Sequence, residues 1–544
     1  MTATPTKPAG LGRSTALMAS GTAASRLLGL VRTSALVATI GMLGSAANAF
    51  GAANKLPSIL YLLIAGGALN AVLVPEVVRA YRRADGQVYV DKLLTLGIVG
   101  LAGLTLVLTA AVPLLTWLYA DFPDPEVQRL TVALAYWCVP QVFFYGLYAL
   151  LGQVLNARGS FGPFMWAPVV NNIVAIAGLG VFVALWGTRV PPAGQAGDVS
   201  WWGPEQIAVL AGTATLGVVA QALVLVVPLH RSGFRYRPRW GLRGSGLGTA
   251  GRVTLWTFLG LVVGQVGVFV VLRVTTAAGT GDTAGNVVYD NAFLIFMLPH
   301  SLVTVSLMTA MFTRLSAKAA ADDTAGVRAD LSLGLRTVGL FTVLATTGIA
   351  VLAYPLVRVI FPSLRSGPAS DLTTVVVTMV AGLVAFGAWS MCQRVYYAYQ
   401  DARSMIPIQV AMMLVVVAGT LIGKAVLDRG LWVAAAGVSM TVSYGLGAVA
   451  ALVVIRRRLG GLDGRRVLVT HAKAVAAAVA AAGAGALVVR LLGPVGSALD
   501  ALVMCAAGGA AIAGVYVALL VVLRARELET LVGPLLRRIR RTRA

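Results

Sequence analysis

Long runs of apolar residues, separated by short polar stretches, fill most of this chain of 544 residues. A helix needs about 20 mainly apolar residues to cross the hydrocarbon core of a bilayer. The runs predict fourteen such helices, at 14–43, 47–79, 93–120, 127–155, 163–186, 205–229, 249–277, 287–316, 331–360, 371–399, 403–427, 431–455, 469–492 and 497–523. We therefore expect an all-α protein that crosses a membrane many times.

The composition agrees with this pattern and excludes two other classes of protein. Hydrophobic residues make up 58% of the chain and charged residues only 12%, which is too little polar surface for soluble domains and too much apolar content for a disordered chain. Arg26 and Arg32 interrupt the first apolar run, so it does not resemble a cleavable signal peptide. With three cysteines and three histidines, the chain offers neither a disulfide framework nor a recognisable metal site.

The net charge of +23 is spread over many loops, and its distribution predicts the topology. Of the 43 Lys and Arg residues, 32 lie in the termini or beside the loops that follow even-numbered spans, and eight lie in the opposite loops. Cytoplasmic loops carry the excess of Lys and Arg, so both termini are expected in the cytoplasm, with anionic lipids near these loops. A nucleic-acid partner is not expected, because such proteins gather their cations on one folded face.

Two pairs of similar segments indicate an internal repeat. Leu56–Pro57 resembles Leu298–Pro299, and the NARGSFGP stretch at 156–163 resembles DARSMIP at 401–407. Each pair is separated by six spans, which predicts two six-helix lobes in parallel orientation with a substrate site between them. We expect an N-lobe at 1–245, a C-lobe at 246–460, and two further helices with a basic cytoplasmic tail at 461–544.

Three cations lie inside the first two spans, at Arg26, Arg32 and Lys55. A charge at the bilayer centre costs roughly 2.5–3.5 kcal/mol, so such residues usually face a water-filled cavity or a partner. One interpretation is a cationic cavity for an anionic cargo, since the planar guanidinium of arginine binds phosphate oxygens in pairs. A second interpretation is that these side chains reach the headgroups or pair with an acid, although no Asp or Glu precedes Glu76.

Several proline residues are expected to affect the shape of the predicted helices. Pro57, Pro75, Pro140 and Pro299 lie inside predicted spans, where they favour bent or broken helices.

The chain contains no HExxH, no GxSxG and no intact phosphate-binding loop, so an enzyme is not expected and no cofactor is implied. A coupling ion is compatible with the sequence, which does not locate a site for one.

Two groups of residues match the pattern of a known family. They are Ser25–Arg26, Gly29, Arg32, Asn48–Phe50, Lys55–Pro57 and Val74–Pro75 in the first two spans, with Asp290, Pro299 and Thr313 in the eighth. Through these residues the chain resembles the MurJ/MviN family of lipid II flippases, in the multidrug/oligosaccharidyl-lipid/polysaccharide exporter superfamily. The fourteen predicted helices also match the plan of that family.

The resemblance implies movement of a lipid-linked peptidoglycan precursor from the inner to the outer leaflet of the bacterial plasma membrane by alternating access. Its cargo would be undecaprenyl pyrophosphate bearing a disaccharide-pentapeptide, and the resemblance suggests cell-wall synthesis proteins as further partners. Arg26 and Arg32 match cavity arginines of the family, and Arg32 would bind the pyrophosphate. The other expected substrate-binding residues are Ser25, Asn48, Lys55, Tyr61, Asp290 and Asn291.

The chain also departs from the family pattern. Tyr61 and Asn291 stand where the family carries arginines, Thr33 replaces an acid in many members, and Asn48 is an amide in place of an acid. Either Lys55 and Arg273 supply part of the missing charge, or the cargo is another polyprenyl-linked glycan. Two further functions are compatible with the sequence: a drug or ion antiporter of the same superfamily, and a non-transporting scaffold for cell-wall enzymes.

Overall fold

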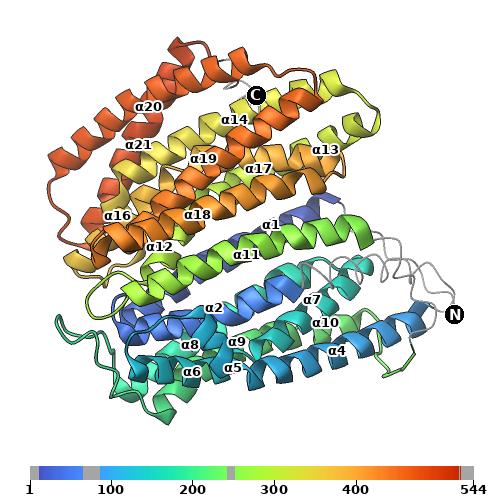
Figure 1. Cartoon of the computed structure of the whole chain (residues 1–544), viewed down its shortest axis with the longest axis vertical. Helices are drawn as coiled ribbons and strands as arrows, with labels where there is room; N and C mark the ends of the chain where they lie inside the picture. Colours follow the sequence, from blue (N-terminus) through green and yellow to red (C-terminus); the bar gives the residue numbers. More distant parts are fainter. Residues whose placement is uncertain (1–10, 65–85, 242–250, 526, 528–544) are drawn as a thin grey trace, which may run out of the picture. The chain divides into compact units, whose positions relative to one another are not determined.

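The computed structural model describes residues 11–64, 86–241, 251–525 and 527, and these residues form helices and no strands (Figure 1). Within these described residues, twelve helices are long and apolar enough to cross a membrane, and a bent pair brings the number of candidate spans to 13. The second predicted span begins as α2 (Ser45–Ile64) and continues into residues outside the described part. The prediction of an all-α polytopic membrane protein is confirmed.

The chain divides into two compact units near Leu261, and Gly279–Asp282 belongs to the first. The predicted lobe boundary at 245 lies outside the described residues. The first unit contains α1 (Leu11–Ile40), α2, α4 (Gly86–Ala110), α5 (Val112–Tyr119), α6 (Pro125–Cys138), α7 (Gln141–Ala157), α8 (Gly162–Trp186), α9 (Pro204–Leu223), α10 (Val226–Arg231) and the beginning of α11 (Gly251–Ala278).

The second unit contains the rest of α11 and the remaining elements. These are α12 (Asn286–Pro299), η2 (His300–Thr304), α13 (Val305–Ala320), α14 (Thr324–Val351), α15 (Ala353–Ile360), α16 (Ser366–Val380), α17 (Leu383–Ala398), η3 (Arg403–Met405), α18 (Ile406–Val426), η4 (Arg429–Leu431), α19 (Trp432–Arg458), α20 (Gly464–Leu492) and α21 (Ala498–Val522).

Proline breaks the helix at some of the predicted sites and leaves it continuous at another. Pro140 separates α6 from α7, and Pro299 ends α12 where a π-helical turn begins, as expected for a residue that lacks the N–H of a helical hydrogen bond. In contrast, α2 continues through Pro57 as one helix. Pro75 lies outside the described residues. The 44° bend between α16 and α17 at Ala381–Gly382 contains no proline and was not predicted.

Helix α10 in the first unit and helix α19 in the second unit end in the same way. A glycine with positive φ follows α10 at Gly233 and α19 at Gly460, where a side chain would be strained. An arginine guanidinium donates to the carbonyl just before each glycine, from Arg158 to Ser232 and from Arg328 to Leu459. Each contact ties the helix end to an earlier segment of its own unit.

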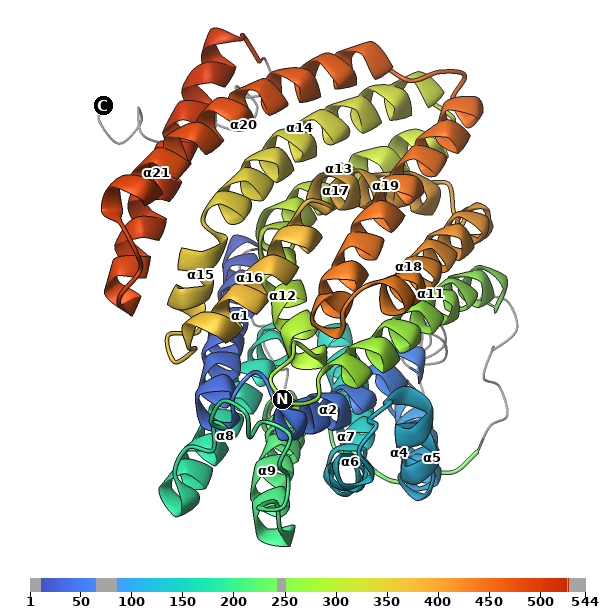
Figure 2. The ribbon, with the colours of Figure 1, turned by 60° about the vertical axis from the view of Figure 1, so that its left-hand side comes forward.

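The last two helices pack against each other and against α14 and α15 of the second unit, as Figures 1 and 2 show for α20 and α14. Small side chains make this possible, because Ala474, Ala477 and Ala481 are buried in the cluster that joins α20 to α14 and α21. The Tyr516 hydroxyl donates to the Leu340 carbonyl at 2.8 Å, which fixes α21 against α14.

We expect Gly339→Val in α14 to lower the free energy of unfolding by about 1–3 kcal/mol. A Cβ atom at Gly339 would collide with the imidazole of His471 on α20, whose Nδ1 lies 2.9 Å from the Val467 carbonyl oxygen. Gly348→Ala, in the same helix with nothing within 4 Å of the added atom, is the control and should leave stability unchanged or slightly higher. Thermal unfolding of the purified variants in detergent measures both. Equal melting temperatures for the two variants would contradict the proposed close approach.

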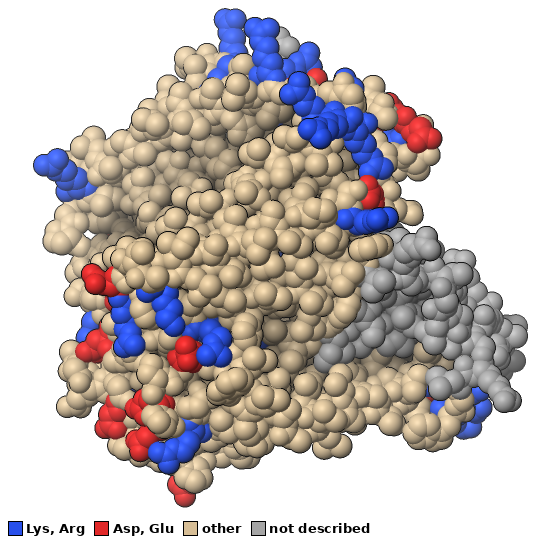
Figure 3. All heavy atoms as spheres, in the orientation of Figure 1, with Lys and Arg blue, Asp and Glu red and all other residues tan. Residues whose placement is uncertain are grey.

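Charged side chains gather where helices end. Figure 3 shows Lys, Arg, Asp and Glu in separate groups on the visible face of each unit, with wide uncharged surfaces between the groups. Exposed leucine and valine residues such as Leu106, Val181 and Leu216 lie on the long helices between these ends. This distribution is that of helices surrounded by hydrocarbon and ending in water.

Candidate functional site

Arg32 is half-buried in the first unit, on α1, which packs closely against α8. A Cβ atom at Gly21 would lie 2.7 Å from the Trp166 ring, so glycine permits the contact between the two helices. Further along α1, the Asn172 amide of α8 donates to the Ser25 carbonyl at 2.9 Å. Both contacts precede Arg32 in α1 and hold the helix in place.

A pocket of about 120 Å³ lies beside Arg32, and we call it the Arg32 pocket. Five helices of the first unit, α1, α2, α7, α8 and α9, line it. The lining residues are Arg32, Thr33, Leu36, Phe50, Asn54, Ser58, Gln141, Tyr145, Ala175, Leu179, Leu210, Thr213, Ala214 and Val218. The volume has room for several water molecules or a small polar group, and is below the roughly 300 Å³ at which pockets for drug-sized ligands begin.

Amide and hydroxyl groups share the Arg32 pocket with the cation. The Gln141 Nε2 atom donates to the Asn54 Oδ1 atom at 3.3 Å and to the Thr215 Oγ1 atom at 2.9 Å, and the Thr215 hydroxyl donates to the Trp137 carbonyl at 2.7 Å. These bonds orient the amide groups of α2 and α7. Tyr145, one turn after Gln141 in α7, lines the same pocket as Arg32 and Ser58.

No carboxylate lines the Arg32 pocket, and the structure shows no ion pair between Arg32 and any described residue. A guanidinium carries five N–H donors in a planar fork and stays charged. Because a half-buried cation among apolar helices needs compensation, this arrangement favours water or an anionic oxygen group as its partner. The pocket can therefore hold a phosphate-like group in a region otherwise built from apolar helices.

Other residues predicted for the site lie on the same helices but outside this pocket. Arg26 is half-buried on α1 and six residues from Arg32, which places it about 240° around the helix. Lys55 is half-buried on α2 and interacts with other residues. Tyr61, also on α2, stacks obliquely with Tyr145 at 5.6 Å between ring centroids, so it lies next to the pocket wall.

Ser25 and Asn48, which were both predicted for the site, form hydrogen bonds within the fold. The Ser25 carbonyl accepts the bond from Asn172 described above, while Asn48 is completely buried. The Asn48 amide donates to the Gly44 carbonyl at 2.9 Å and to the Gly279 carbonyl at 3.0 Å. The amide therefore joins the start of α2 to the segment after α11. A carboxylate could not donate these bonds, which accounts physically for an amide at this position.

The last two predicted residues belong to α12 in the second unit. Asp290 is half-buried and has interaction partners, and Asn291 is buried with its amide donating to the Val287 carbonyl at 2.8 Å. Arg273, considered as a source of replacement charge, is half-buried on α11. In the ranges that the structure describes, no three His, Cys, Asp or Glu side chains are grouped to hold a metal ion.

Our sequence interpretation missed most of the polar lining of the Arg32 pocket. Asn54 and Ser58 are four residues apart in α2, and Gln141 and Tyr145 are four apart in α7. Residues at this spacing share one face of a helix, and two such pairs in apolar spans could have indicated a polar surface. Nothing in the sequence, however, shows that the two faces meet.

Comparison with known proteins identifies several relatives. The family model described as "Lipid II flippase MurJ" matches residues 37–503, which begins after Arg26 and Arg32. The "Probable lipid II flippase MurJ" of Haemophilus influenzae is 27% identical over 72% of this chain and 76% of its own length. The protein of the same name from Vibrio cholerae is 26% identical over 71% and 73%.

Solved structures show the same fold. The structure titled "Lipid II flippase MurJ, inward closed conformation" aligns with a TM-score of 0.71 over 94% of this chain and 99% of its own, at 17% identity. An inward-facing multidrug resistance MATE family transporter of the MOP superfamily aligns with a TM-score of 0.65 over 80% and 94%, at 16% identity. The chain therefore shares its fold with both of these structures.

Proposed function

Because the chain belongs to the lipid II flippase MurJ family, we propose that it carries lipid II from the inner to the outer leaflet of the bacterial inner membrane. It is a multi-pass membrane protein, and its family is one of transporters. We also propose the details predicted from the sequence: both termini in the cytoplasm, two six-helix lobes with two additional helices, and transport by alternating access without catalysis.

The observation that carries the proposal is an arginine without an acidic partner beside a polar pocket inside a membrane-spanning unit, within the part of the chain that the structure describes. Placing such a charge in apolar surroundings costs roughly 2.5–3.5 kcal/mol even on the lenient insertion scale, so it is expected where an anion must be bound. Lipid II carries its negative charge on a pyrophosphate. A guanidinium can bind two phosphate oxygens at once, which gives both orientation and attraction.

The size of the Arg32 pocket suggests how it takes part. At about 120 Å³ it can hold a phosphate-like group, whereas a disaccharide-pentapeptide is far too large for it. We propose that Arg32 binds the pyrophosphate while the amides of Asn54 and Gln141 complete the polar surroundings. The roles of Ser25, Arg26, Asn48, Lys55, Tyr61, Asp290 and Asn291 in holding the cargo remain predictions.

Reconstitution tests the proposal directly. The full-length protein is placed in vesicles that carry fluorescent lipid II, and a membrane-impermeant quencher reports how much of the label is exposed outside. We expect accelerated movement of label between the leaflets compared with protein-free vesicles, and no acceleration for a fluorescent phospholipid that lacks pyrophosphate. A non-transporting scaffold would leave both labels where they began, which would overturn the proposal.

A further inference from the structure

The segment that follows α10 forms no helix and lies against the beginning of α4 in the first unit (Figure 1). In its sequence FRYRPRWG, at 234–241, arginine occupies every second position from 235 to 239. Phe234 is buried in a cluster that includes residues of α4, and Tyr236 packs against that cluster, while the three arginines are exposed. We call this segment the basic strap, because aromatic side chains fix it to the protein and cations cover its outer side.

Hydrogen bonds hold the basic strap against α4. The Tyr236 and Thr95 hydroxyls lie 2.8 Å apart, and the Arg239 N–H donates to the Thr95 Oγ1 atom at 3.1 Å. The Gln87 side-chain amide donates to the Arg235 carbonyl at 3.4 Å. Both arginines contribute backbone atoms to these bonds, so their guanidinium groups are available for another partner.

The basic strap lies where α4 passes from water into lipid. It contacts the helix from Gln87 to Thr95, over about 12 Å of the helix axis. Lys92 is the last charged residue of α4, and the residues at 93–110 extend for about 27 Å, close to the roughly 30 Å hydrocarbon core of a bilayer. Gly241 lies beside Lys92, because a Cβ atom there would be 3.3 Å from the Lys92 Nζ atom. The strap therefore ends at the level of the lipid head groups.

Trp240 and one face of α4 offer apolar surface at this level. Trp240 is 71% exposed, and tryptophan is favoured at the boundary between water and lipid because it is apolar with one polar N–H. Leu96 and Val99 follow Lys92 by four and seven residues, so the three side chains share one face of the helix. Leu96 is 44% exposed and Val99 is 46% exposed. An acyl chain can lie over these two residues while its head group reaches the strap.

Positive charge is in excess around the basic strap. In the described parts of α4, α10 and the strap, the one acidic residue is Asp91, which is buried and accepts a hydrogen bond within its own helix. The cations beside it are Lys92 and the arginines at 235, 237 and 239. Guanidinium groups bind phosphate oxygens in pairs, so the excess of three positive charges favours a phosphate-bearing, anionic ligand.

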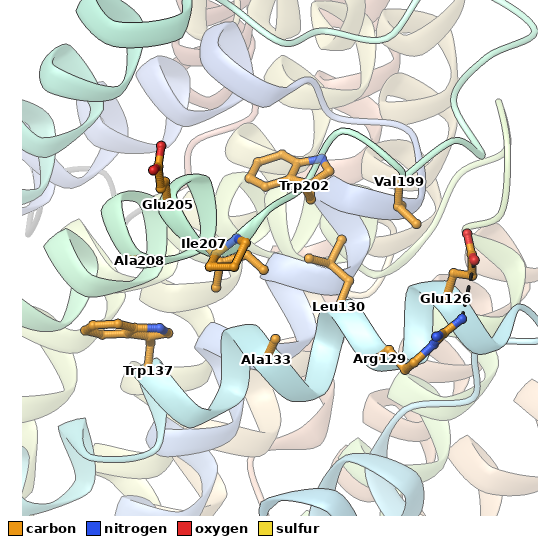
Figure 4. Close-up of a pocket in the computed structure, with 11 residues that line it drawn as sticks. Glu126, Arg129, Leu130, Ala133, Trp137, Val199, Trp202, Glu205, Ile207 and Ala208 are labelled. Atoms are coloured by element: carbon orange, nitrogen blue, oxygen red, sulfur yellow. Dashed lines mark hydrogen bonds and ion pairs between the residues drawn. The ribbon is translucent and has the colours of Figure 1, made fainter.

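The opposite end of the first unit, one crossing further along the chain, has a different balance of charge. A groove of about 730 Å³ lies there, where α6 and α9 begin, and Trp137 and Trp202 contribute to its walls. Figure 4 shows the ion pair of Arg129 with Glu126 at one end of this groove and Glu205 at the other. Its charged lining residues are thus two acids and one cation. An anionic head group is therefore favoured at the basic strap and disfavoured at this groove.

From this arrangement we infer that the basic strap is a binding site for an anionic phospholipid of the leaflet that meets this end of the first unit. In the proposed topology this is the inner leaflet. The phosphate lies among the strap arginines and Lys92, Trp240 lies beside the glycerol, and an acyl chain follows Leu96 and Val99. The depth of the strap and its exposed tryptophan favour a lipid over a soluble acidic partner. The inference is independent of the proposed cargo and of the Arg32 pocket.

Native mass spectrometry of the full-length protein, titrated with single lipids in detergent, tests the inference. The probes are phosphatidylglycerol, which carries a net negative charge, and phosphatidylethanolamine, which carries none. We expect phosphatidylglycerol to bind at least about tenfold more tightly, and millimolar inorganic phosphate not to displace it, because free phosphate lacks the acyl chain. Equal affinity for the two lipids would overturn the inference, and so would displacement by inorganic phosphate, which would indicate a site for a soluble anion.

Variants with matched charge place the lipid at the strap. Replacing the three strap arginines together, as Arg235→Gln, Arg237→Gln and Arg239→Gln, should lower the affinity for phosphatidylglycerol about tenfold or more, to the level of phosphatidylethanolamine. The hydrogen bonds to α4 use backbone atoms, so the melting temperature should be unchanged. The control removes three exposed arginines of another basic loop, as Arg456→Gln, Arg457→Gln and Arg466→Gln, and should keep the preference for phosphatidylglycerol. Equal losses in the two triple variants would show that binding follows total charge and not the strap.

Trp240→Ala separates the apolar contact from the charge. This variant should weaken both lipids severalfold and leave the ratio of their affinities unchanged, because the indole contacts the part of the molecule that the two lipids share. Unchanged affinity for both lipids would contradict the position assigned to the bound lipid.

Discussion

Replacing Arg32 with alanine should abolish the ability of this protein to support growth of cells depleted of their own lipid II flippase. The substitution removes the only cation that lines the described Arg32 pocket and leaves the neutral amides and hydroxyls around it. A charge-assisted bidentate contact contributes roughly 1.5–3 kcal/mol, so its loss should reduce cargo binding by one to two orders of magnitude. Growth after depletion, together with protein level in the membrane, measures the effect.

Two further variants distinguish the loss of anion binding at Arg32 from a general effect of replacing an arginine. Arg32→Lys keeps the charge without the planar fork, so we expect growth at a reduced rate. Arg365→Ala, an exposed arginine just before α16, should support growth like the unmodified protein. Full rescue by Arg32→Ala at a normal protein level would eliminate the proposed role of this side chain.

The second large effect is expected from Arg336→Met in α14, which should destabilise the protein by about 3–5 kcal/mol. The Arg336 guanidinium pairs with the Glu527 carboxylate, and both side chains are largely buried at 18% and 7% exposure. The substitution breaks this buried ion pair and removes the guanidinium from a carboxylate that also accepts from the Thr470 hydroxyl at 3.5 Å. Unfolding of the purified protein in detergent, followed by circular dichroism, measures the loss.

A double variant tests whether the loss of stability comes from breaking this ion pair. Arg336→Met together with Glu527→Leu removes both partners, and replacing a buried pair by apolar groups is often neutral, so most of the stability should return. Arg129→Met, at an ion pair exposed to water, should have no measurable effect. If the double variant is as unstable as Arg336→Met alone, the ion pair is not the cause.

Much of the helical architecture could be predicted because apolar length is a direct physical requirement for crossing a bilayer. The breaks at Pro140 and Pro299 follow from the chemistry of proline. The bend at Ala381–Gly382 was missed, and α2 continues without a break through Pro57, where a bent or broken helix was expected. Proline removes one hydrogen bond, but whether a membrane helix bends in response depends on its neighbours.

The candidate site was predictable only in part. Arg32 could be identified from the cost of its charge within an apolar run, and the structure places it beside a polar pocket. Gln141 and Asn54, which meet at 3.3 Å, are 87 residues apart and could not be paired by reading along the chain. Asn48 was expected at the site for its resemblance to a family position, and its burial with two backbone partners became visible only in the fold.

By itself, the sequence determined that this protein is a bundle of membrane-spanning helices with cations placed where lipid would otherwise be. Both properties can be recognised from short stretches of sequence. A backbone in hydrocarbon must form its hydrogen bonds within its own helix, and a charged side chain there usually faces water or a partner. The tertiary structure decided which side chains share a cavity. Trp137 and Trp202 line one groove, and Arg32 and Gln141 another pocket, because helices distant in sequence pack side by side and bring their faces together.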